Sequence, residues 1–145
     1  MRVLALDIGE KRVGVAYADT AHATALPICV LNAADVEGGT APFKRVLEDY
    51  EPELLVCGRP LTLRGERGPQ ADRVEKVARA VADATGLGLE FVDERLSSAE
   101  AKRILREQGM NERQMRGKVD CVAASLFLQT WLDRSKPTMG ETDES

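Results

Sequence analysis

Acidic residues occupy three places, far apart in the sequence, where carboxylates could do chemistry. Asp7 directly follows the apolar run VLAL, the pair Asp93 and Glu94 directly follows LEFV, and Asp120 begins DCVAAS within a long apolar segment. Carboxylates that met in one place would repel one another, and a divalent cation would compensate their charge. Mg²⁺ and Mn²⁺ prefer oxygen ligands, and ions held by carboxylates can clamp the attacking and leaving oxygens of a phosphodiester. The acids therefore indicate metal-dependent phosphodiester hydrolysis, provided that the fold brings them together.

The segments around these acids alternate between strand-type and helix-type patterns. Apolar runs predict five strands, over residues 3–8, 13–18, 28–31, 54–58 and 89–92, of which the first two form a hairpin. Apolar residues at helical spacing and helix-stop signals predict four helices, over residues 43–50, 69–85, 97–108 and 117–133. Ser97 and Glu100 have the spacing of a capping box at the start of the third helix.

This order of elements predicts an α/β fold built on one mixed, five-stranded sheet flanked by helices. A hairpin meander followed by right-handed crossovers gives the spatial strand order 3-2-1-4-5, with the second strand antiparallel to its neighbours. The winding direction then changes between the first and fourth strands, and ligands of such sheets bind there, beyond the carboxyl ends of the strands. Asp7 ends the first strand and the Asp93–Glu94 pair ends the fifth, so both are expected at that crevice.

Small residues leave space for the acids to converge. The first and fifth strands lie about 10 Å apart with one strand between them, and that strand ends at Gly58, which has no side chain to block the gap. Ala123 and Ala124 allow the last helix to lie close to the sheet, so that Asp120 can point at the strand ends. The three acidic positions are therefore expected to meet in one pocket.

Composition and length limit the class of protein. The chain has 145 residues, enough for one domain, which we expect over residues 1–134, followed by a disordered polar tail over 135–145. No apolar run approaches the roughly 18 residues of a membrane span, and no signal-peptide pattern opens the chain. Three cysteines without paired spacing are expected to be buried thiols, so we expect a cytoplasmic protein without a membrane partner. A net charge of −4 argues against an overall basic nucleic-acid binder, but a local basic patch stays open.

Four blocks of the sequence resemble a known family. They are LALDIGEKRVGVAYAD, VCGRPLTLRGERGPQA, VDERLSSAEA and GKVDCVAASLFLQTWL, and together they cover nearly the whole chain except the tail. They are similar to the YqgF/RuvX family, bacterial proteins of the RNase H-like fold that are described as Holliday-junction resolvases and as nucleases maturing the 5′ end of pre-16S rRNA. The chain departs from the family at Glu10, where Thr or Ser is common, at Arg59, where an apolar residue is usual, and at Arg64, a place that is often acidic.

The resemblance implies a site and a reaction. Asp7, Glu94 and Asp120 match the catalytic and metal-binding acids, whereas Asp93 is either a further ligand or a group that supports one. Two Mg²⁺ or Mn²⁺ ions would be held with substrate bound, and a phosphodiester bond would be cleaved by in-line attack of water. The implied activity is that of an endonuclease on structured nucleic acid, either precursor 16S rRNA or a four-way DNA junction.

Several basic residues on predicted loops beside the strand ends could contact phosphates, which position a nucleic acid without reading its sequence. Taken singly, most fit a solvated surface charge better, but as a cluster around three acids they favour a polyanion. We expect substrate specificity to lie in the loops 62–68 and 109–117, while DNA and RNA stay open as substrates. The candidate nucleic-acid contacts are Lys11, Arg12, Arg59, Arg64, Arg67, Arg95 and Lys118.

Each acid could also have a purely structural role. Asp7 can stabilise the turn that follows it, Glu94 can pair with Arg95, and Asp120 can favour the helix dipole. The chain could then be a non-catalytic RNase H-like scaffold that binds nucleic acid, or an ATP-binding protein of the actin-like superfamily, whose first phosphate loop has a similar form. If four-way junctions are the substrate, two symmetric cuts require a homodimer, whereas a processing RNase can act as a monomer.

Overall fold

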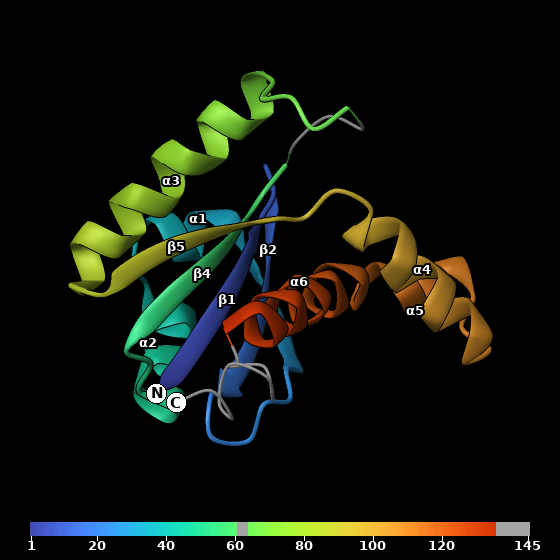
Figure 1. Ribbon diagram of the computed structural model, residues 1–145, viewed down its shortest axis with the longest axis horizontal. Helices are drawn as coiled ribbons and strands as arrows, with labels where there is room; N and C mark the ends of the chain where they lie inside the picture. The colour runs from blue at the N-terminus through green and yellow to red at the C-terminus, as the bar shows by residue number, and fades with distance from the viewer. Residues whose placement is uncertain (61–63, 136–145) are drawn as a thin grey trace, which may run out of the picture.

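One five-stranded sheet organises the computed structural model, which describes residues 1–60 and 64–135 (Figure 1). β2 runs antiparallel to β1 and β3, while β4 runs parallel to β1 and β5. The strand order β3-β2-β1-β4-β5 confirms the predicted topology. The strands are β1 Arg2–Ile8, β2 Arg12–Asp19, β3 Leu26–Asn32, β4 Leu54–Arg59 and β5 Gly88–Asp93.

Helices cover both faces of the sheet. The helices α1, α2 and α3 pack on one face through a core that includes Phe43 and Val74, and α6 packs on the other through a core that includes Phe127 and Leu128. Figure 1 shows that α4 and α5 lie beyond the end of the sheet, at one end of α6. The helices are α1 Ala33–Glu37, α2 Ala41–Tyr50, α3 Pro69–Thr85, α4 Ser97–Glu107, α5 Glu112–Arg116 and α6 Val119–Ser135.

Alternate residues of β1 enter the two cores. Leu4 and Leu6 belong to the core under α1, α2 and α3, whereas Val3 and Ala5 belong to the core under α6. Because side chains along a strand alternate between its faces, Asp7 continues the row of Val3 and Ala5. The acid at the end of β1 is therefore on the α6 face.

The start of α4 differs from its prediction. The N-cap is Leu96, in the left-handed region at φ +76°, and no side chain caps the helix, so the predicted capping box of Ser97 and Glu100 is wrong. Ser97 is instead the first helical residue, and its backbone N–H donates to the carbonyl of Glu94 at 2.9 Å, which closes a tight turn after β5. That turn, rather than a hydroxyl cap, determines where the helix begins.

A capping box does occur in α5, which lies within the predicted loop 109–117. The Asn111 carboxamide accepts from the backbone N–H of Gln114, whose side chain accepts from the Asn111 N–H, each at 2.9 Å. The prediction missed both five-residue helices, α1 and α5, because segments of that length show too few turns for helical periodicity. Part of the expected loop 62–68 and most of the expected tail 135–145 lie outside the described residues.

The cysteines are expected to be buried thiols, and two of the three are. Cys57 and Cys121 are buried and Cys29 is half-buried, and all three are free thiols. No helix in the described ranges has the length and apolar composition to cross a membrane.

Candidate active site

Asp7 and Glu94 meet beyond the ends of β1 and β5. Glu94 immediately follows β5, and the carboxyl groups of the two acids are hydrogen-bonded to each other. Burial, the Asp7 charge and the proton that Glu94 donates to Asp7 together raise the pKa of Glu94 to about 9. Burial also raises the pKa of Asp7, an effect that the Glu94 hydrogen bond offsets in part. The two acids therefore share one proton in the protein without a cation.

Gly58 makes this contact possible. It is the next-to-last residue of β4, the strand between β1 and β5, and it lies on the same face of the sheet as the Leu54 and Val56 side chains that contact α6. A Cβ at Gly58 would lie 2.8 Å from Oε2 of Glu94 and 2.8 Å from Cε2 of Phe127. The Glu94 side chain thus occupies the space above Gly58, as the sequence predicted.

Asp120 reaches the same place through a second glycine. Gly14 of β2 pairs with Asp7 of β1. A Cβ at Gly14 would lie 2.7 Å from the backbone nitrogen of Cys121 and would collide with the carbonyl of Asp120. The first turn of α6 therefore packs directly on the backbone of β2, beside Asp7. Sequence reasoning attributed this approach to two alanines and missed Gly14, although a glycine inside a strand often marks a close backbone contact.

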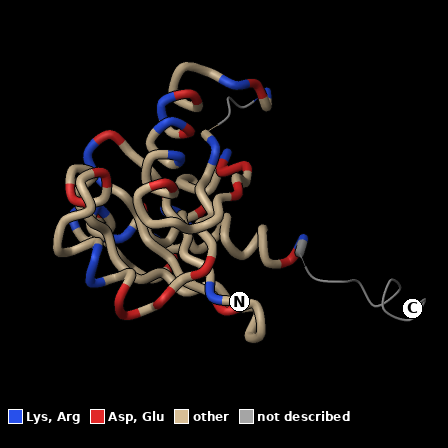
Figure 2. The backbone as a smooth tube through the Cα atoms, turned by 90° about the vertical axis from the view of Figure 1, so that its left-hand side faces the viewer, with Lys and Arg blue, Asp and Glu red and all other residues tan. Residues whose placement is uncertain are grey.

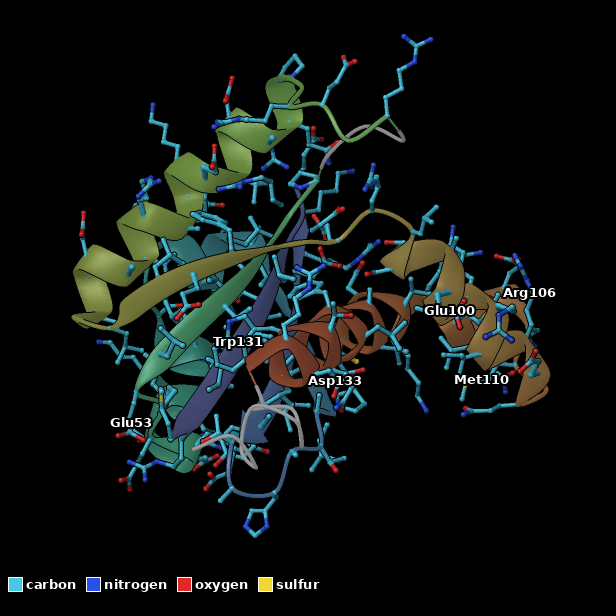
Figure 3. All side chains as sticks on the ribbon, viewed as in Figure 1. Glu53, Glu100, Arg106, Met110, Trp131 and Asp133 are labelled. Carbon is cyan, nitrogen blue, oxygen red and sulfur yellow. The ribbon has the colours of Figure 1, made fainter. Side chains whose placement is uncertain are left out.

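The far end of α6 is held to the sheet by a polar contact. The indole N–H of Trp131, labelled in Figure 3, donates to Oε1 of Glu90 on β5 at 3.0 Å. Between these two ends, Ala123 and Ala124 are fully buried, as expected for small residues that let the helix lie close to the strands. Contacts along the whole of α6 therefore hold Asp120, in its first turn, in place.

The side chain of Asp120 forms an ion pair with Arg12. Nε of Arg12 donates to Oδ2 of Asp120 at 3.1 Å, and both side chains are partly exposed. The Asp120 charge still acts on the acid pair, since it contributes to the raised pKa of both Asp7 and Glu94. Within residues 1–60 and 64–135, no three His, Cys, Asp or Glu side chains are arranged to hold a metal ion. Two of the three expected ligands are in contact, and the third is engaged with Arg12.

Asp93 is turned away from this group. Its Oδ1 accepts from the backbone N–H of Arg95 at 2.8 Å, and its Oδ2 lies 2.9 Å from Nη2 of Arg95. Asp93 and Arg95, a predicted phosphate contact, thus form a local ion pair after β5. Three other predicted contacts, Lys11, Arg64 and Lys118, have exposed side chains.

Two further predicted cations are engaged by α3. Arg59 donates through Nη2 to Oε1 of Glu75 at 2.7 Å, and Arg67 forms an ion pair with the same buried carboxylate. Because Arg59 follows Gly58 in β4, its side chain leaves the opposite face of the sheet, where the guanidinium lies 4.8 Å from the ring centroid of Phe91. The structure places Arg59 on the α3 side of the sheet, not beside the acid pair.

A crevice of about 450 Å³ opens over the acids. Asp7, Glu94 and Asp120 all line it, together with Gln70 of α3 and the exposed Leu96. It lies between β1, the turn after β5, and the starts of α3, α4 and α6. The crevice therefore exposes all three acids to one continuous space.

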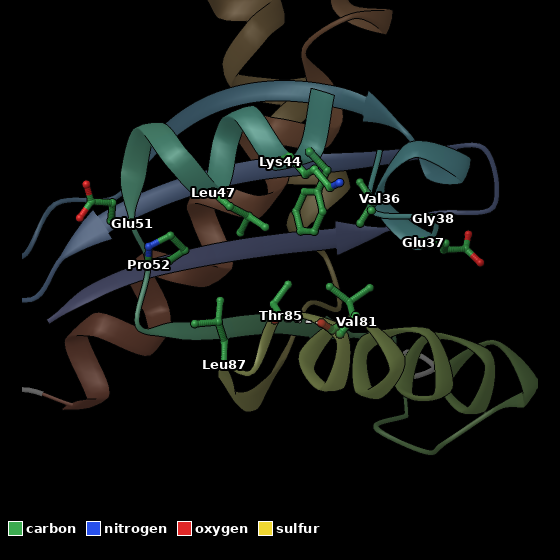
Figure 4. Close-up of a pocket in the computed structure, with 13 residues that line it drawn as sticks. Val36, Glu37, Gly38, Lys44, Leu47, Glu51, Pro52, Val81, Thr85 and Leu87 are labelled. Atoms are coloured by element: carbon green, nitrogen blue, oxygen red, sulfur yellow. Dashed lines mark hydrogen bonds between the residues drawn. The ribbon is translucent and has the colours of Figure 1, made fainter. Parts of the chain in front are cut away.

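A second cavity, of about 460 Å³, lies between α1, α2 and α3 (Figure 4). Its lining includes the apolar side chains of Leu47, Val81 and Leu87, and its charged residues, such as Glu37 and Glu51, are exposed. It contains no pair of acids in contact, so the crevice over Asp7 and Glu94 is the better candidate for chemistry.

Comparisons with known sequences identify the family of the chain. A family model described as that of the Holliday junction resolvase RuvX matches residues 1–134. A protein of Chloroflexus aurantiacus named "Putative pre-16S rRNA nuclease" is 41% identical over 137 residues, which cover 93% of this chain and 90% of that protein. A protein of the same name from Anaeromyxobacter sp. is 42% identical over 133 residues, which cover 92% of this chain and 97% of that protein.

Comparisons with solved structures find the same architecture in resolvases. Thermus thermophilus RuvC in complex with a Holliday junction superimposes with a TM-score of 0.54 at 14% identity, over 93% of this chain and 97% of that one. The fowlpox virus resolvase in complex with junction DNA gives a TM-score of 0.56 at 13% identity, over 92% and 98% of the two chains. These likenesses concern the fold, and they confirm the expected RNase H-like architecture. The family model that matches residues 1–134 and the relatives that are 41% and 42% identical show that the chain belongs to the RuvX family.

Proposed function

We propose that this chain is a metal-dependent endonuclease that hydrolyses phosphodiester bonds in structured nucleic acid. The observation that carries the proposal is the contact between the half-buried acids Asp7 and Glu94, with Asp120 on the same crevice. Its relatives are named for precursor 16S rRNA and its family model for the Holliday junction, so both substrates are candidates.

The donor set fits a hard divalent cation. The three acids offer only oxygen ligands. A cation could take the place of the proton between Asp7 and Glu94 and neutralise the negative charge of the two carboxylates. We propose that Asp7, Glu94 and Asp120 together hold two Mg²⁺ or Mn²⁺ ions when substrate is bound, while Asp93 stays with Arg95. Such ions would lower the pKa of the attacking water and stabilise the charge on the departing oxygen.

The protein's own groups have distinct roles in this proposal. Asp7 and Glu94 give up their shared proton, and Gly58 keeps the space in which their carboxylates stay together. Asp120 would hold the cation in place of its contact with Arg12, and the Arg12 guanidinium would then be available for a phosphate oxygen at the rim. The ion pair thus holds two groups of the site in place until substrate and cation arrive.

Substrate and assembly are linked in this proposal. Resolution of a four-way junction needs two symmetric cuts and therefore two copies of a chain that carries one site, whereas trimming of a precursor RNA needs only one copy. We further propose that the chain works in the cytoplasm, where its three free thiols would persist.

One observation favours a second candidate, a non-catalytic scaffold that binds nucleic acid. The Arg12–Asp120 ion pair leaves no group of three acids ready for a metal ion among the described residues. A scaffold would bind precursor RNA or junction DNA and cleave neither in any metal. Cleavage assays therefore separate the two functions.

The test is cleavage of end-labelled precursor 16S RNA and of labelled four-way DNA junctions, in Mg²⁺, in Mn²⁺ and in EDTA. We expect cleavage only with a metal ion, and none by Asp7→Asn or Glu94→Gln. Asp83→Asn is the matched control, because Asp83 is an exposed acid on α3, and it should cleave like the wild type. Cleavage in EDTA, or by Asp7→Asn with normal rates, would overturn the mechanism.

A further inference from the structure

A smaller pocket, of about 290 Å³, lies next to the crevice over the acids, on the side of α4 and α5. Asp120 and Ser98 line both pockets, so this pocket adjoins the space over the acids at these two residues. Arg12 lies on its β2 side, and Lys102 of α4 and Arg116 of α5 lie on the other. The pocket therefore has basic residues on two sides.

We propose that this pocket binds a backbone phosphate of the same nucleic-acid strand that crosses the acid crevice, with Lys102 and Arg116 as its ligands. The inference rests on the proposed function and deepens it, because it states where the substrate strand continues beyond the reacting phosphate. Neither residue was among the cations that sequence reasoning selected.

Among the basic residues of α4 and α5, Lys102 and Arg116 are the two that line the pocket. Arg103 pairs with Glu100 and Glu107 along α4, and Arg106 lies 3.6 Å from Glu112 of α5. Figure 3 shows Arg106 near the outer end of α4, away from the sheet. The side chains of Lys102 and Arg116, by contrast, are exposed and make no ion pair or hydrogen bond within residues 1–60 and 64–135.

The pocket is built on packed helices. Met115 of α5 lines it and is buried, and Ala101 and Leu105 of α4 are buried as well. The capping box of Asn111 and Gln114 stabilises the start of α5, so Arg116 projects from an ordered helix. Both cations therefore extend from an ordered frame next to the active site.

Charge balance favours a phosphate that belongs to a longer strand over a free anion. The lining contains Arg12, Lys102 and Arg116, but also Glu112 and Asp120. Two acids among three cations make a weak site for an anion in solution, whereas a phosphate attached to a bound strand arrives at high effective concentration. Basic and acidic residues are interspersed along the chain (Figure 2), so such local contacts, rather than a basic face, must guide the strand.

The test compares two double variants that each remove one lysine and one arginine. Lys102→Ala/Arg116→Ala removes the proposed ligands, and Lys44→Ala/Arg45→Ala removes two exposed cations of α2, on the other face of the sheet. Binding of the four-way DNA junction is measured in EDTA, so that no cleavage occurs, across a range of salt concentrations. We expect the first variant alone to reduce the slope of log K against log salt by about 1, the value for one lost phosphate contact.

A neutral methylphosphonate, placed at one backbone position of the junction at a time, then locates the contact. At one position near the cleaved bond it should weaken binding by the wild type and leave binding by Lys102→Ala/Arg116→Ala unchanged. Equal salt slopes for the wild type and this variant would overturn the inference. A second outcome would also overturn it: inorganic phosphate binds the wild type but not the variant, while the two proteins bind the junction equally well. The pocket would then be a site for a free anion.

These outcomes are separable from failure of the proposed function. If the wild type cleaves and the Lys102→Ala/Arg116→Ala slope is unchanged, the endonuclease stands and this phosphate site is wrong. If the wild type cleaves neither substrate in any metal but the slope changes as expected, the phosphate contact stands and the catalytic proposal is wrong. All four substituted side chains are exposed, so unfolding temperatures should match the wild type.

Discussion

Gly14 lies directly opposite Asp7 in the pairing of β1 with β2, and the backbone of Asp120 packs on it. On the other side of Asp7, Gly58 lies near the end of β4 and leaves the space that the Glu94 side chain fills. The catalytic candidates thus converge because each strand beside Asp7 lacks a side chain at that level. One glycine admits a helix backbone, and the other admits a carboxylate.

Gly14→Ala should displace the start of α6. The new methyl group has no space beside the carbonyl of Asp120, and overpacking of this kind costs about 1–3 kcal/mol of the free energy of unfolding. Urea denaturation measures that cost. Gly117→Ala is the matched control: Gly117 follows α5 two residues before the start of α6, has φ −86°, and has open space around it. An unfolding free energy for Gly14→Ala equal to that of Gly117→Ala would contradict the packing described here.

Gly58→Ala should impair catalysis through Glu94. A Cβ 2.8 Å from Oε2 of Glu94 must push the carboxyl group away from Asp7 or shift Phe127. A displacement of about 1 Å at a reacting centre can lower the rate about 100-fold, so we expect a loss of that order in kcat. The same Gly117→Ala control should keep full activity. Normal cleavage by Gly58→Ala would show that the position of Glu94 does not matter.

The sequence predicted the sheet order and the meeting of two acids because both follow from local patterns. A hairpin and right-handed crossovers leave few arrangements, and acids that end parallel strands arrive at one edge. It could not predict the Arg12–Asp120 ion pair, since no local pattern relates residues 108 positions apart. The direction of Arg59 was available from strand alternation, because it follows Gly58, whose face of the sheet carries the acids.

Arg12→Ala should strengthen metal binding and weaken nucleic-acid binding. Removing the guanidinium frees Oδ2 of Asp120, so the affinity for Mn²⁺ should rise when measured by isothermal titration calorimetry. The lost cation should weaken binding of junction DNA and reduce its salt slope by about 1. Lys11→Ala removes the same charge one residue away and controls for long-range electrostatics. If both variants change Mn²⁺ affinity equally, the direct contact with Asp120 is not the cause.

The stability of the protein in EDTA should fall as the pH rises through the neutral range. Glu94 has an ordinary pKa of 4.5 and a pKa of about 9 in the folded protein. Between these values the folded state binds more protons than the unfolded chain, so the free energy of unfolding decreases with increasing pH. This contribution is fully present below about 4.5 and is lost as the pH approaches about 9. The raised pKa of Asp7 acts in the same direction.

Urea unfolding at several pH values across this window measures the effect in the wild type and in Glu94→Gln, which cannot titrate. The variant should show a flatter dependence on pH, because its amide keeps a donor to Asp7 without a charge to bury. Glu48→Gln, an exposed acid on α2, should keep the wild-type dependence. A wild-type profile that is already as flat in EDTA as that of Glu94→Gln would show that the two acids share no proton.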